Sequence, residues 1–471
     1  MFHSTRGNKL ISSPEAILNG LASDGGLYVL DKVNKIDYKD LIDDSYPLMA
    51  SKILKVFFPE FELKELEEEI TNAYKSFDIS DVVDLHKCDN SYFLELFHGP
   101  TLAFKDLALV VLPRLMKLSK KKLGYEKNIT ILTATSGDTG GAALNGFKDI
   151  PGISIVVLYP NGGVSKVQES QMCSFRSDNA KMYAVNGNFD DCQNLVKKLF
   201  NEHRELNISS ANSINIARLA PQVVYYFYSY IKLLKNNEIK DGELVNFVVP
   251  TGNFGNIFAG FYAKKMGLPI NDLICASNKN NVLTEYFNTS IYNKNREFYK
   301  TNSPSMDIII SSNFERFLYY ALNENTDLLA LKMNELKEKG EYKFSNPFDY
   351  FYGYSTNEDE TLNIIKNVFD KYNYAIDPHT SVAYGAYLQY KKEALNNYKT
   401  IILSTASPFK FPETVLKALG YNDNDPLNSL SRIINKKIPD VLNYPEIKRE
   451  VVDLASIENK VVEVIKCLQS R

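Results

Sequence analysis

The sequence contains few cysteines, and none of them lie close together. Five cysteines are spread over 471 residues, without a Cys-x-x-Cys motif. An odd number of scattered cysteines fits neither a disulfide framework nor a zinc ribbon, so we expect a protein of a reducing compartment. No group of His, Cys and carboxylate residues has the spacing of metal ligands, and we therefore predict no metal site.

The sequence has little net charge and no long apolar run. The 54 Lys and Arg residues nearly balance the 57 Asp and Glu residues, which leaves a formal charge of −3. This balance gives no positive surface for a phosphodiester backbone. No segment reaches the roughly 18 apolar residues that cross a bilayer, and the amino end lacks the apolar core of a secretory signal. We expect a cytoplasmic protein without nucleic-acid or membrane partners.

What is present is the composition of a packed globular protein, with 44% hydrophobic and 24% charged residues. Residues 1–90 read as mostly helical, and from residue 128 short β-branched runs alternate with helical stretches. Repeated strand-helix-strand units predict a parallel sheet covered by helices on both faces. We expect strands over 129–135, 153–159, 181–185, 244–250, 272–276 and 400–405.

Three helices are expected between or beside these strands. One covers 190–203 with Asp190 as its N-cap, and another covers 257–266. The third, 223–234, is apolar or aromatic nearly all round, which favours burial between layers over an aromatic membrane or ligand surface.

Lys105 stands in an unusual setting. It follows a Gly-Pro turn and the apolar run 102–104, and it precedes a helical run that starts at Asp106. Apolar neighbours and the positive end of a helix would both lower the pKa of Lys105, toward a neutral and nucleophilic amine. Such an amine can form a Schiff base and later move protons. Position alone favours a surface lysine at a helix start. Pro113 requires that the next helix kink or begin late.

Three of the expected strands end in turns rich in Gly, Ser or Thr, at 136–141, 252–256 and 405–407. Free N–H groups at such helix starts bind a carboxylate or a phosphate, although each turn alone could be a plain strand-to-helix connection. Parallel sheets bind ligands at the carboxyl ends of their strands, so three such turns favour a binding site. The turns match neither a Walker A loop nor GxGxxG, which disfavours a nucleotide.

Longer motifs occur in a fixed order. They are STRG from Ser4, ASDGGLYV from Ala22, HGPTLAFKD from His98, TATSGDTGGAA from Thr133, LYPNGGVSKVQESQM ending at Met172, NGNFDDCQ from Asn186, NSINIARLAPQVVYYFY from Asn212, PTGNFGNIFAGFYAKKMGLPI from Pro250, SPSMDI from Ser303, SSNFERF from Ser311, DPHTSVAYG from Asp377 and STASPFKF from Ser404. The series resembles the long-chain threonine synthases, which are pyridoxal-phosphate enzymes, up to about residue 415.

The resemblance implies an α/β fold of the tryptophan-synthase-β type (fold type II), with parallel or mixed sheets covered by helices and a largely helical N-terminal domain. The expected domains are an N-terminal one over 1–90, a large cofactor-binding α/β domain over 91–127 and 210–425, a small α/β domain over 128–209, and a C-terminal helical tail over 426–471.

The resemblance also implies the roles of individual residues toward pyridoxal 5'-phosphate. Lys105 would be the Schiff-base lysine, and Thr405 would face the pyridine nitrogen. The cofactor phosphate would lie in a cup formed by Gly252, Asn253, Phe254, Gly255 and Asn256. Many relatives carry Asp at the position of Asn256, so its role is less defined than that of the backbone donors.

For the substrate, the resemblance implies two binding segments. The loop of Ser136, Gly137, Asp138 and Thr139 would receive the carboxylate. The substrate phosphate would be bound by Ser213, Asn215 and Arg218, with Lys166 as a further candidate. Ser213 and Asn215 fit helix capping equally well.

The implied reaction converts O-phosphohomoserine and water to L-threonine and phosphate, by γ-elimination and β-addition of water, as the last step of threonine biosynthesis. Lys105 would remove the α-proton and serve several steps by proximity. A hydroxyl such as Thr405 at the pyridine nitrogen would weaken the electron sink and limit transamination. The small domain should close on the substrate, and the protein should be a monomer or a homodimer.

Two other functions stay open. One is another fold-type-II lyase that performs β-elimination or β-replacement on serine-like substrates. The other is a non-catalytic ligand-binding relative, against which the intact Lys105 argues. His98 and His379 are candidate acids or bases, but a histidine beside a Gly-Pro turn often serves local hydrogen bonding.

Overall fold

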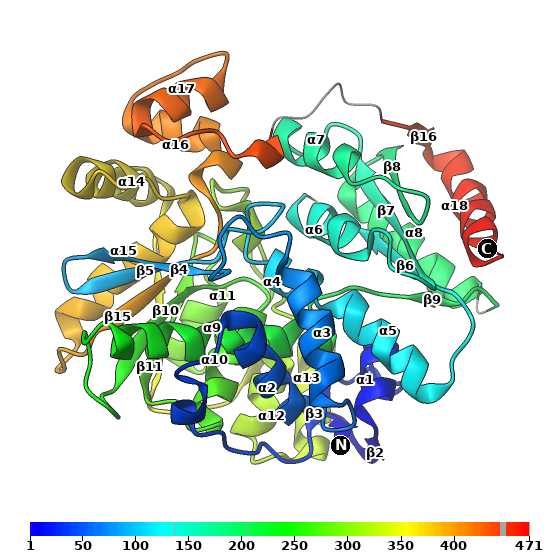
Figure 1. The fold of residues 1–471 in the computed structure, drawn as a ribbon, viewed down its shortest axis with the longest axis horizontal. Coiled ribbons are helices and arrows are strands. Elements are labelled where there is room, and N and C mark those ends of the chain that lie inside the picture. Colours follow the sequence, from blue (N-terminus) through cyan, green and yellow to red (C-terminus); the bar gives the residue numbers. More distant parts are fainter. Residues whose placement is uncertain (136, 204, 443–448, 471) are drawn as a thin grey trace.

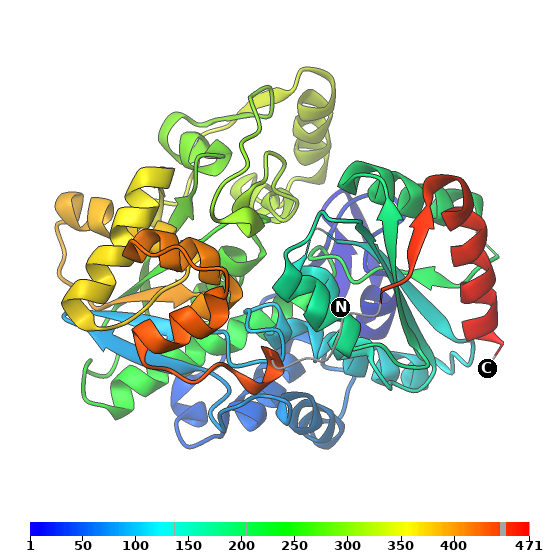
Figure 2. The ribbon, with the colours of Figure 1, turned by 90° about the horizontal axis from the view of Figure 1, so that it is seen from above.

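The chain folds into two α/β bodies that lie next to each other, with an N-terminal segment packed below them (Figure 1). The computed structural model describes residues 1–135, 137–203, 205–442 and 449–470. Figure 2 shows the same two bodies from above, with the chain's last helix on the outer face of the smaller one. In the described part of the chain, no helix combines the length and apolarity needed to span a bilayer.

The larger body is built on a mixed six-stranded sheet in the order β14-β11-β10-β15-β5-β4. Its strands are β4 (Asp84–Cys88), β5 (Ser91–Glu95), β10 (Val245–Pro250), β11 (Ile270–Ser277), β14 (Phe351–Ser355) and β15 (Thr400–Ser404). Only the edge strand β4 is antiparallel to its neighbour. The other five strands therefore end at the same edge of the sheet.

Helices cover both faces of this sheet. Along β10, Phe247 and Val249 pack on the side of α9 and α10, whereas Val248 packs on the side of α15. The alternation is the period of two of a strand buried on both faces. The covering helices are α9 (Ile216–Lys235), α10 (Gly255–Lys265), α14 (Glu358–Tyr372), α15 (Pro378–Glu393), α16 (Pro412–Leu419) and α17 (Pro426–Ile434).

The smaller body has a parallel five-stranded sheet in the order β16-β8-β7-β6-β9. Its strands are β6 (Ile129–Ala134), β7 (Ile153–Pro160), β8 (Ala180–Asn186), β9 (Ile208–Ser209) and β16 (Val451–Asp453). Helix α6 (Asp138–Phe147) covers one face with α7 (Lys166–Ser174) beside it, and α8 (Phe189–Glu202) and α18 (Leu454–Gln469) cover the other.

The remaining elements surround these two sheets. An antiparallel sheet, three α-helices and one 3-10 helix form the N-terminal segment, which packs against α5 (Leu112–Leu123) and α9. These elements are β1 (Phe2–Ser4), β2 (Gly7–Ile11), α1 (Ser13–Asn19), β3 (Tyr28–Leu30), η1 (Tyr38–Leu41), α2 (Tyr46–Phe57) and α3 (Leu63–Tyr74). The others are α4 (Asp106–Leu109), α5 (Leu112–Leu123), α11 (Val282–Thr289), β12 (Ile291–Asn293), η2 (Pro304–Met306), α12 (Phe314–Ala321), α13 (Thr326–Glu338), β13 (Glu341–Lys343), η3 (Pro408–Lys410) and η4 (Asp440–Leu442).

The six expected strands are confirmed, each within two residues at either end. The expected buried helix is part of α9, and α5 begins late with Pro113 in its first turn. The N-cap expected at Asp190 is wrong, because Asn188 caps α8 in a capping box with Asp191.

The expected helical segments at the two ends also contain strands. The four strands β1 to β4 lie within residues 1–90, and β16 lies within the C-terminal tail. Both sets are short and lack the regular alternation that predicts a strand, so only their tertiary partners define them.

Candidate active site

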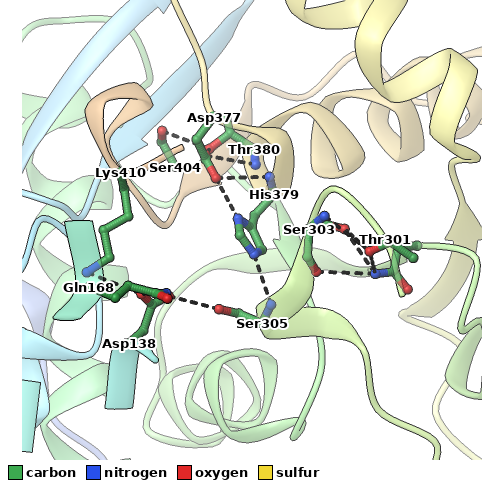
Figure 3. Close-up of polar contacts among 11 residues, drawn as sticks. Asp138, Gln168, Thr301, Ser303, Ser305, Asp377, His379, Thr380, Ser404 and Lys410 are labelled. Atoms are coloured by element: carbon green, nitrogen blue, oxygen red, sulfur yellow. Dashed lines mark hydrogen bonds and ion pairs between the residues drawn. The ribbon is translucent and has the colours of Figure 1, made fainter. Parts of the chain in front are cut away.

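The carboxyl ends of the two sheets face each other. Asp138, at the start of α6 in the smaller body, accepts a hydrogen bond from Ser305 Oγ at 3.0 Å. Its Oδ1 also lies 3.2 Å from Lys410 Nζ, in the loop that follows β15 of the larger body (Figure 3). Parallel α/β sheets bind ligands outside the carboxyl ends of their strands. The region between the two edges is therefore the candidate site.

Backbone pairing brings Lys105 next to Thr405. The Phe104 N–H donates to the Thr405 carbonyl at 2.8 Å, and the Ser407 N–H donates to the Leu102 carbonyl at 3.0 Å. Leu102 has a φ of +59°, a left-handed conformation that a leucine rarely adopts. Such backbone strain clusters at functional sites, where the surrounding structure enforces it.

The Lys105 amine lies in surroundings that disfavour its charged form. Its side chain is half-buried, and it makes no hydrogen bond or ion pair with any residue that the structure describes. Burial lowers the pKa of Lys105, and the charges of Arg218 and Lys410 lower it further against the opposing effect of Asp138. The helix-end argument contributes little, because α4 has only four residues.

The 252–256 turn forms a cradle of backbone donors. The N–H groups of residues 252–255 have no acceptor among the described residues, and Phe254 has a φ of +62°. A Cβ on Gly252 would lie 2.9 Å from the Ser305 carbonyl oxygen, so only glycine fits there without displacing the backbone. Free N–H groups at the start of α10, a helix of eleven residues, form the donor set that binds a phosphate.

Asn256 adds a buried donor to this cradle. Its Oδ1 accepts hydrogen bonds from the hydroxyls of Tyr225 at 2.6 Å and Tyr226 at 3.2 Å. Its Nδ2 is buried and has no partner among the described residues. A buried amide that lacks an acceptor is costly, and a bound phosphate oxygen would remove that cost. The cradle therefore fits the phosphate of pyridoxal phosphate.

The turn before α6 presents a second pair of free donors. Ser136 lies outside the described residues. Thr135 Oγ1 accepts the N–H groups of Gly137 and Gly140, each at 3.0 Å. The N–H groups of Asp138 and Thr139 donate to no other described residue. Two adjacent amides at the start of a ten-residue helix suit the two oxygens of a carboxylate.

Gly137 is required by the close approach of α7. It has a φ of +145°, and a Cβ there would lie 2.4 Å from the Gln168 side chain. Gln168 in turn donates to Asp138 Oδ1 at 2.8 Å. Although burial opposes its ionisation, the charges of Lys410 and Lys105 hold the pKa of Asp138 well below its usual range.

Arg218 is a buried cation without a carboxylate partner in the described part of the chain. It is 4% exposed, its Nη1 donates to the Ala211 carbonyl at 2.6 Å, and its Nε has no partner there. Burial lowers the pKa of Arg218 to about 10. The charge of Arg218 is one of those that lower the pKa of Lys105, so Arg218 belongs to the electrostatic surroundings of the site.

The other predicted phosphate ligands are placed differently. Asn215 caps α9 through Oδ1 and donates from Nδ2 to the Ile17 carbonyl at 2.9 Å, so its side chain is already used. The Ser213 carbonyl accepts from Asn313 Nδ2 at 3.2 Å. Lys166 is exposed at the first turn of α7.

The two histidines are held by neighbouring groups. His98 lies 2.9 Å from both Asp78 and Glu95, and these hydrogen bonds overcome burial and raise the pKa of His98 to about 9. His379 Nε2 accepts the Ser305 N–H at 3.2 Å, so Nδ1 carries the proton that it shares with Asp377 at 2.7 Å (Figure 3). Both ring nitrogens of each histidine are therefore occupied.

Several residues at this site were missed by the sequence analysis. They are Gln168, Gln171, Ser305 and Lys410. Lys410 belongs to the STASPFKF motif, which could have singled it out, but a lysine in an exposed turn has the same local sequence. Across the residues that the structure describes, no group of three His, Cys, Asp or Glu side chains could hold a metal ion.

Family profiles match nearly the whole chain. The profile for the threonine synthase N terminus matches residues 1–74, the profile for pyridoxal-phosphate dependent enzymes matches 77–405, and the profile for the threonine synthase C-terminal region matches 380–466.

Curated relatives and solved structures agree with these profiles. The chain is 38% identical to a threonine synthase of Schizosaccharomyces pombe over 464 residues, which cover 89% of this chain and 90% of the relative. It is 37% identical to one of Saccharomyces cerevisiae, covering 89% of each. The crystal structure of pyridoxal-phosphate-bound threonine synthase from Brucella melitensis superposes with a TM-score of 0.88 at 37% identity, covering 99% of each chain. The chain therefore belongs to the threonine synthase family of pyridoxal-phosphate-dependent enzymes, with the fold type expected from its sequence.

Proposed function

We propose that this chain converts O-phosphohomoserine and water to L-threonine and phosphate, as a carbon–oxygen lyase that acts on a phosphate ester. Membership of the threonine synthase family supports this proposal. The observation that carries it is the Lys105 amine, which is unpaired among the described residues and shares a sheet edge with a cradle of free backbone N–H groups. A covalently bound, phosphorylated cofactor needs both features.

The residues of this edge fit pyridoxal phosphate. Gly252, Asn253, Phe254 and Gly255 would hold its phosphate through backbone N–H groups, with Asn256 as a side-chain donor. Lys105 would form the covalent bond. When bound, the cofactor supplies a conjugated electron sink that stabilises negative charge on carbon atoms near the substrate's amino group.

Thr405 would meet the pyridine nitrogen. Its side chain is 5% exposed and stands beside Lys105 through the Phe104–Thr405 backbone bond. A hydroxyl does not keep a pyridine nitrogen protonated as a carboxylate does. Thr405 therefore moderates the electron sink, which limits transamination.

Lys105 would move protons at its Nζ. Burial and two nearby cations lower its pKa, which favours the neutral amine that can accept a proton from the substrate's α-carbon. The tether holds the same amine beside the neighbouring carbon, so one group serves several transfers by proximity.

The substrate's two anionic groups would bind to two different segments near Lys105. The N–H groups of Asp138 and Thr139, which have no acceptor in the described part of the chain, suit the carboxylate. The unpaired Nε of Arg218 suits the phosphate, with Ser213 and Lys166 as further contacts and Asn215 as the cap that positions this helix. The two bodies would close to exclude water, since premature water diverts reactive intermediates.

Phosphate release tests this proposal. Purified protein with added cofactor should release phosphate from O-phosphohomoserine and form threonine, and it should not release phosphate from O-phosphoserine. Lys105→Ala provides the control for contaminating phosphatase. Release from O-phosphoserine alone would identify a β-eliminating lyase, and release from neither compound by a cofactor-loaded protein would identify a ligand-binding relative.

A further inference from the structure

Lys410 is a buried cation at the junction of the two bodies. Its residue is 2% exposed, and its Nζ donates to the Thr101 carbonyl at 2.7 Å and to Gln171 Oε1 at 2.8 Å. The third neighbour of Nζ is Asp138 Oδ1 at 3.2 Å. An ammonium group has three donors, and here three oxygens from three separate segments surround it. Hydrogen bonds to three oxygens stabilise an ammonium group that is shielded from water.

Asp138 would by itself be an obstacle to substrate binding. It is a buried carboxylate on the first residue of α6, where the N–H groups of Asp138 and Thr139, which have no acceptor among the described residues, suit the substrate carboxylate. Two carboxylates within one helical turn repel each other strongly where water is scarce. The helix start can receive an anion only if the charge of Asp138 is compensated.

A separate observation indicates a ligand at this place. Gln171 is 1% exposed, and its Oε1 is occupied by Lys410. Its Nε2 is buried and has no partner among the described residues. Lys410 thus fixes the orientation of an amide that retains an unused donor beside the Asp138 turn.

We propose that Lys410 is a positioning residue that neutralises Asp138, so that the start of α6 accepts the carboxylate of the substrate. This inference rests on the proposed function, because it needs a substrate with a carboxylate. Lys410 touches no reacting atom and acts through Asp138 and Gln171. Its removal leaves a buried negative charge beside the carboxylate subsite, whereas removal of Asp138 leaves a surplus positive charge.

Binding of L-threonine to the holoenzyme tests whether loss of the two charges changes the affinity in opposite directions. Titration calorimetry compares the wild type with Lys410→Met, Asp138→Asn and the double variant. Lys410→Met should weaken threonine binding roughly tenfold or more, and Asp138→Asn should tighten it. The double variant should return to within about threefold of the wild type, because both charges are gone. The control ligand is 1-aminopropan-2-ol, which is threonine without its carboxylate, and its affinity should not follow this pattern.

If the Lys410–Asp138 ion pair only holds the fold together, the variants should bind threonine differently from this expectation. The inference is overturned if Asp138→Asn weakens threonine binding as Lys410→Met does, or if binding of the control amine falls in parallel. Circular dichroism shows whether Lys410→Met folds. If it does not, the Asp138→Asn variant and the double variant still show whether loss of the negative charge tightens or weakens threonine binding. If the wild type releases phosphate from O-phosphohomoserine but threonine binding by the variants does not depend on these two charges, the inference is overturned and the proposed function stands. A wild type that neither releases phosphate nor binds threonine overturns the proposed function as well.

Discussion

Substituting alanine for Gly252 tests whether the 252–256 turn holds the cofactor phosphate. The new Cβ would lie 2.9 Å from the Ser305 carbonyl oxygen, 3.1 Å from Ile308 Cδ1 and 3.3 Å from Met306 Cα. Ordinary contacts begin at 3.4 Å, so the shortest contact is 3.4 − 2.9 = 0.5 Å too close. Two of the three neighbours are backbone atoms, which cannot rotate away. Either the segment around Ser305 or the cradle itself must move.

The affinity for the cofactor should fall as a result. Forcing an extra methyl group into a packed site costs typically about 1–3 kcal/mol. The empty cradle can relieve this strain by moving outward, but a cradle that holds a phosphate cannot. The strain therefore falls on the bound state, and the dissociation constant for pyridoxal phosphate should rise about 5- to 150-fold.

Spectrophotometric titration of the apoprotein measures this constant, and thermal unfolding with and without cofactor checks it independently. Gly141→Ala is the matched control, because its Cβ would meet Met172 Cγ at 3.6 Å and Thr101 Cγ2 at 3.8 Å, both ordinary contacts. The control should keep its cofactor affinity. An unchanged dissociation constant in Gly252→Ala would refute the assignment of the phosphate to this loop.

Two further predictions concern stability. Asp78 and Glu95 overcome the effect of burial and raise the pKa of His98 to about 9, whereas a histidine in the unfolded chain titrates near 6.5. Protonated His98 therefore stabilises the folded protein fully below about pH 6.5, and this stabilisation is lost as the pH rises through about 9. The advantage in Tm over His98→Gln should shrink across that window, and a constant difference would contradict the assignment. Ile465→Ala, which removes a buried side chain between α18 and the smaller sheet, should lower the free energy of unfolding in urea by about 2–5 kcal/mol. A loss below about 1 kcal/mol would show that α18 contributes little.

The sequence predicts the two sheets well where strands are β-branched and buried. Val245–Pro250 and Ile153–Pro160 are such strands. They are buried on both faces, and each is an apolar run interrupted by one polar residue, Asn246 or Ser154. The strand Phe351–Ser355 is not predicted, because its Phe-Tyr-Gly-Tyr-Ser sequence has no regular apolar pattern. Val451–Asp453 is a strand only because it pairs with the edge of the smaller sheet.

The candidate site also depends on tertiary contacts that the local sequence does not predict. The position of Lys105 in its motif indicates a reactive amine. Of the two expected causes, burial is the main one that lowers its pKa, whereas the positive end of a helix contributes little because α4 is short. The charges that lower its pKa come from Arg218 and Lys410, which are 113 and 305 residues further along the chain. No local pattern can show that these cations converge. Lys410 itself reads as a surface residue until the fold encloses it.

The most direct test of the account identifies the lysine that carries the cofactor. The holoenzyme is reduced with borohydride, which fixes the lysine–cofactor bond, and the modified peptide is then mapped by mass spectrometry after digestion. We expect a single modified peptide that contains Lys105, together with loss of the visible absorption band in Lys105→Ala. Modification of another lysine, or a wild type that stays colourless with added pyridoxal phosphate, would contradict it.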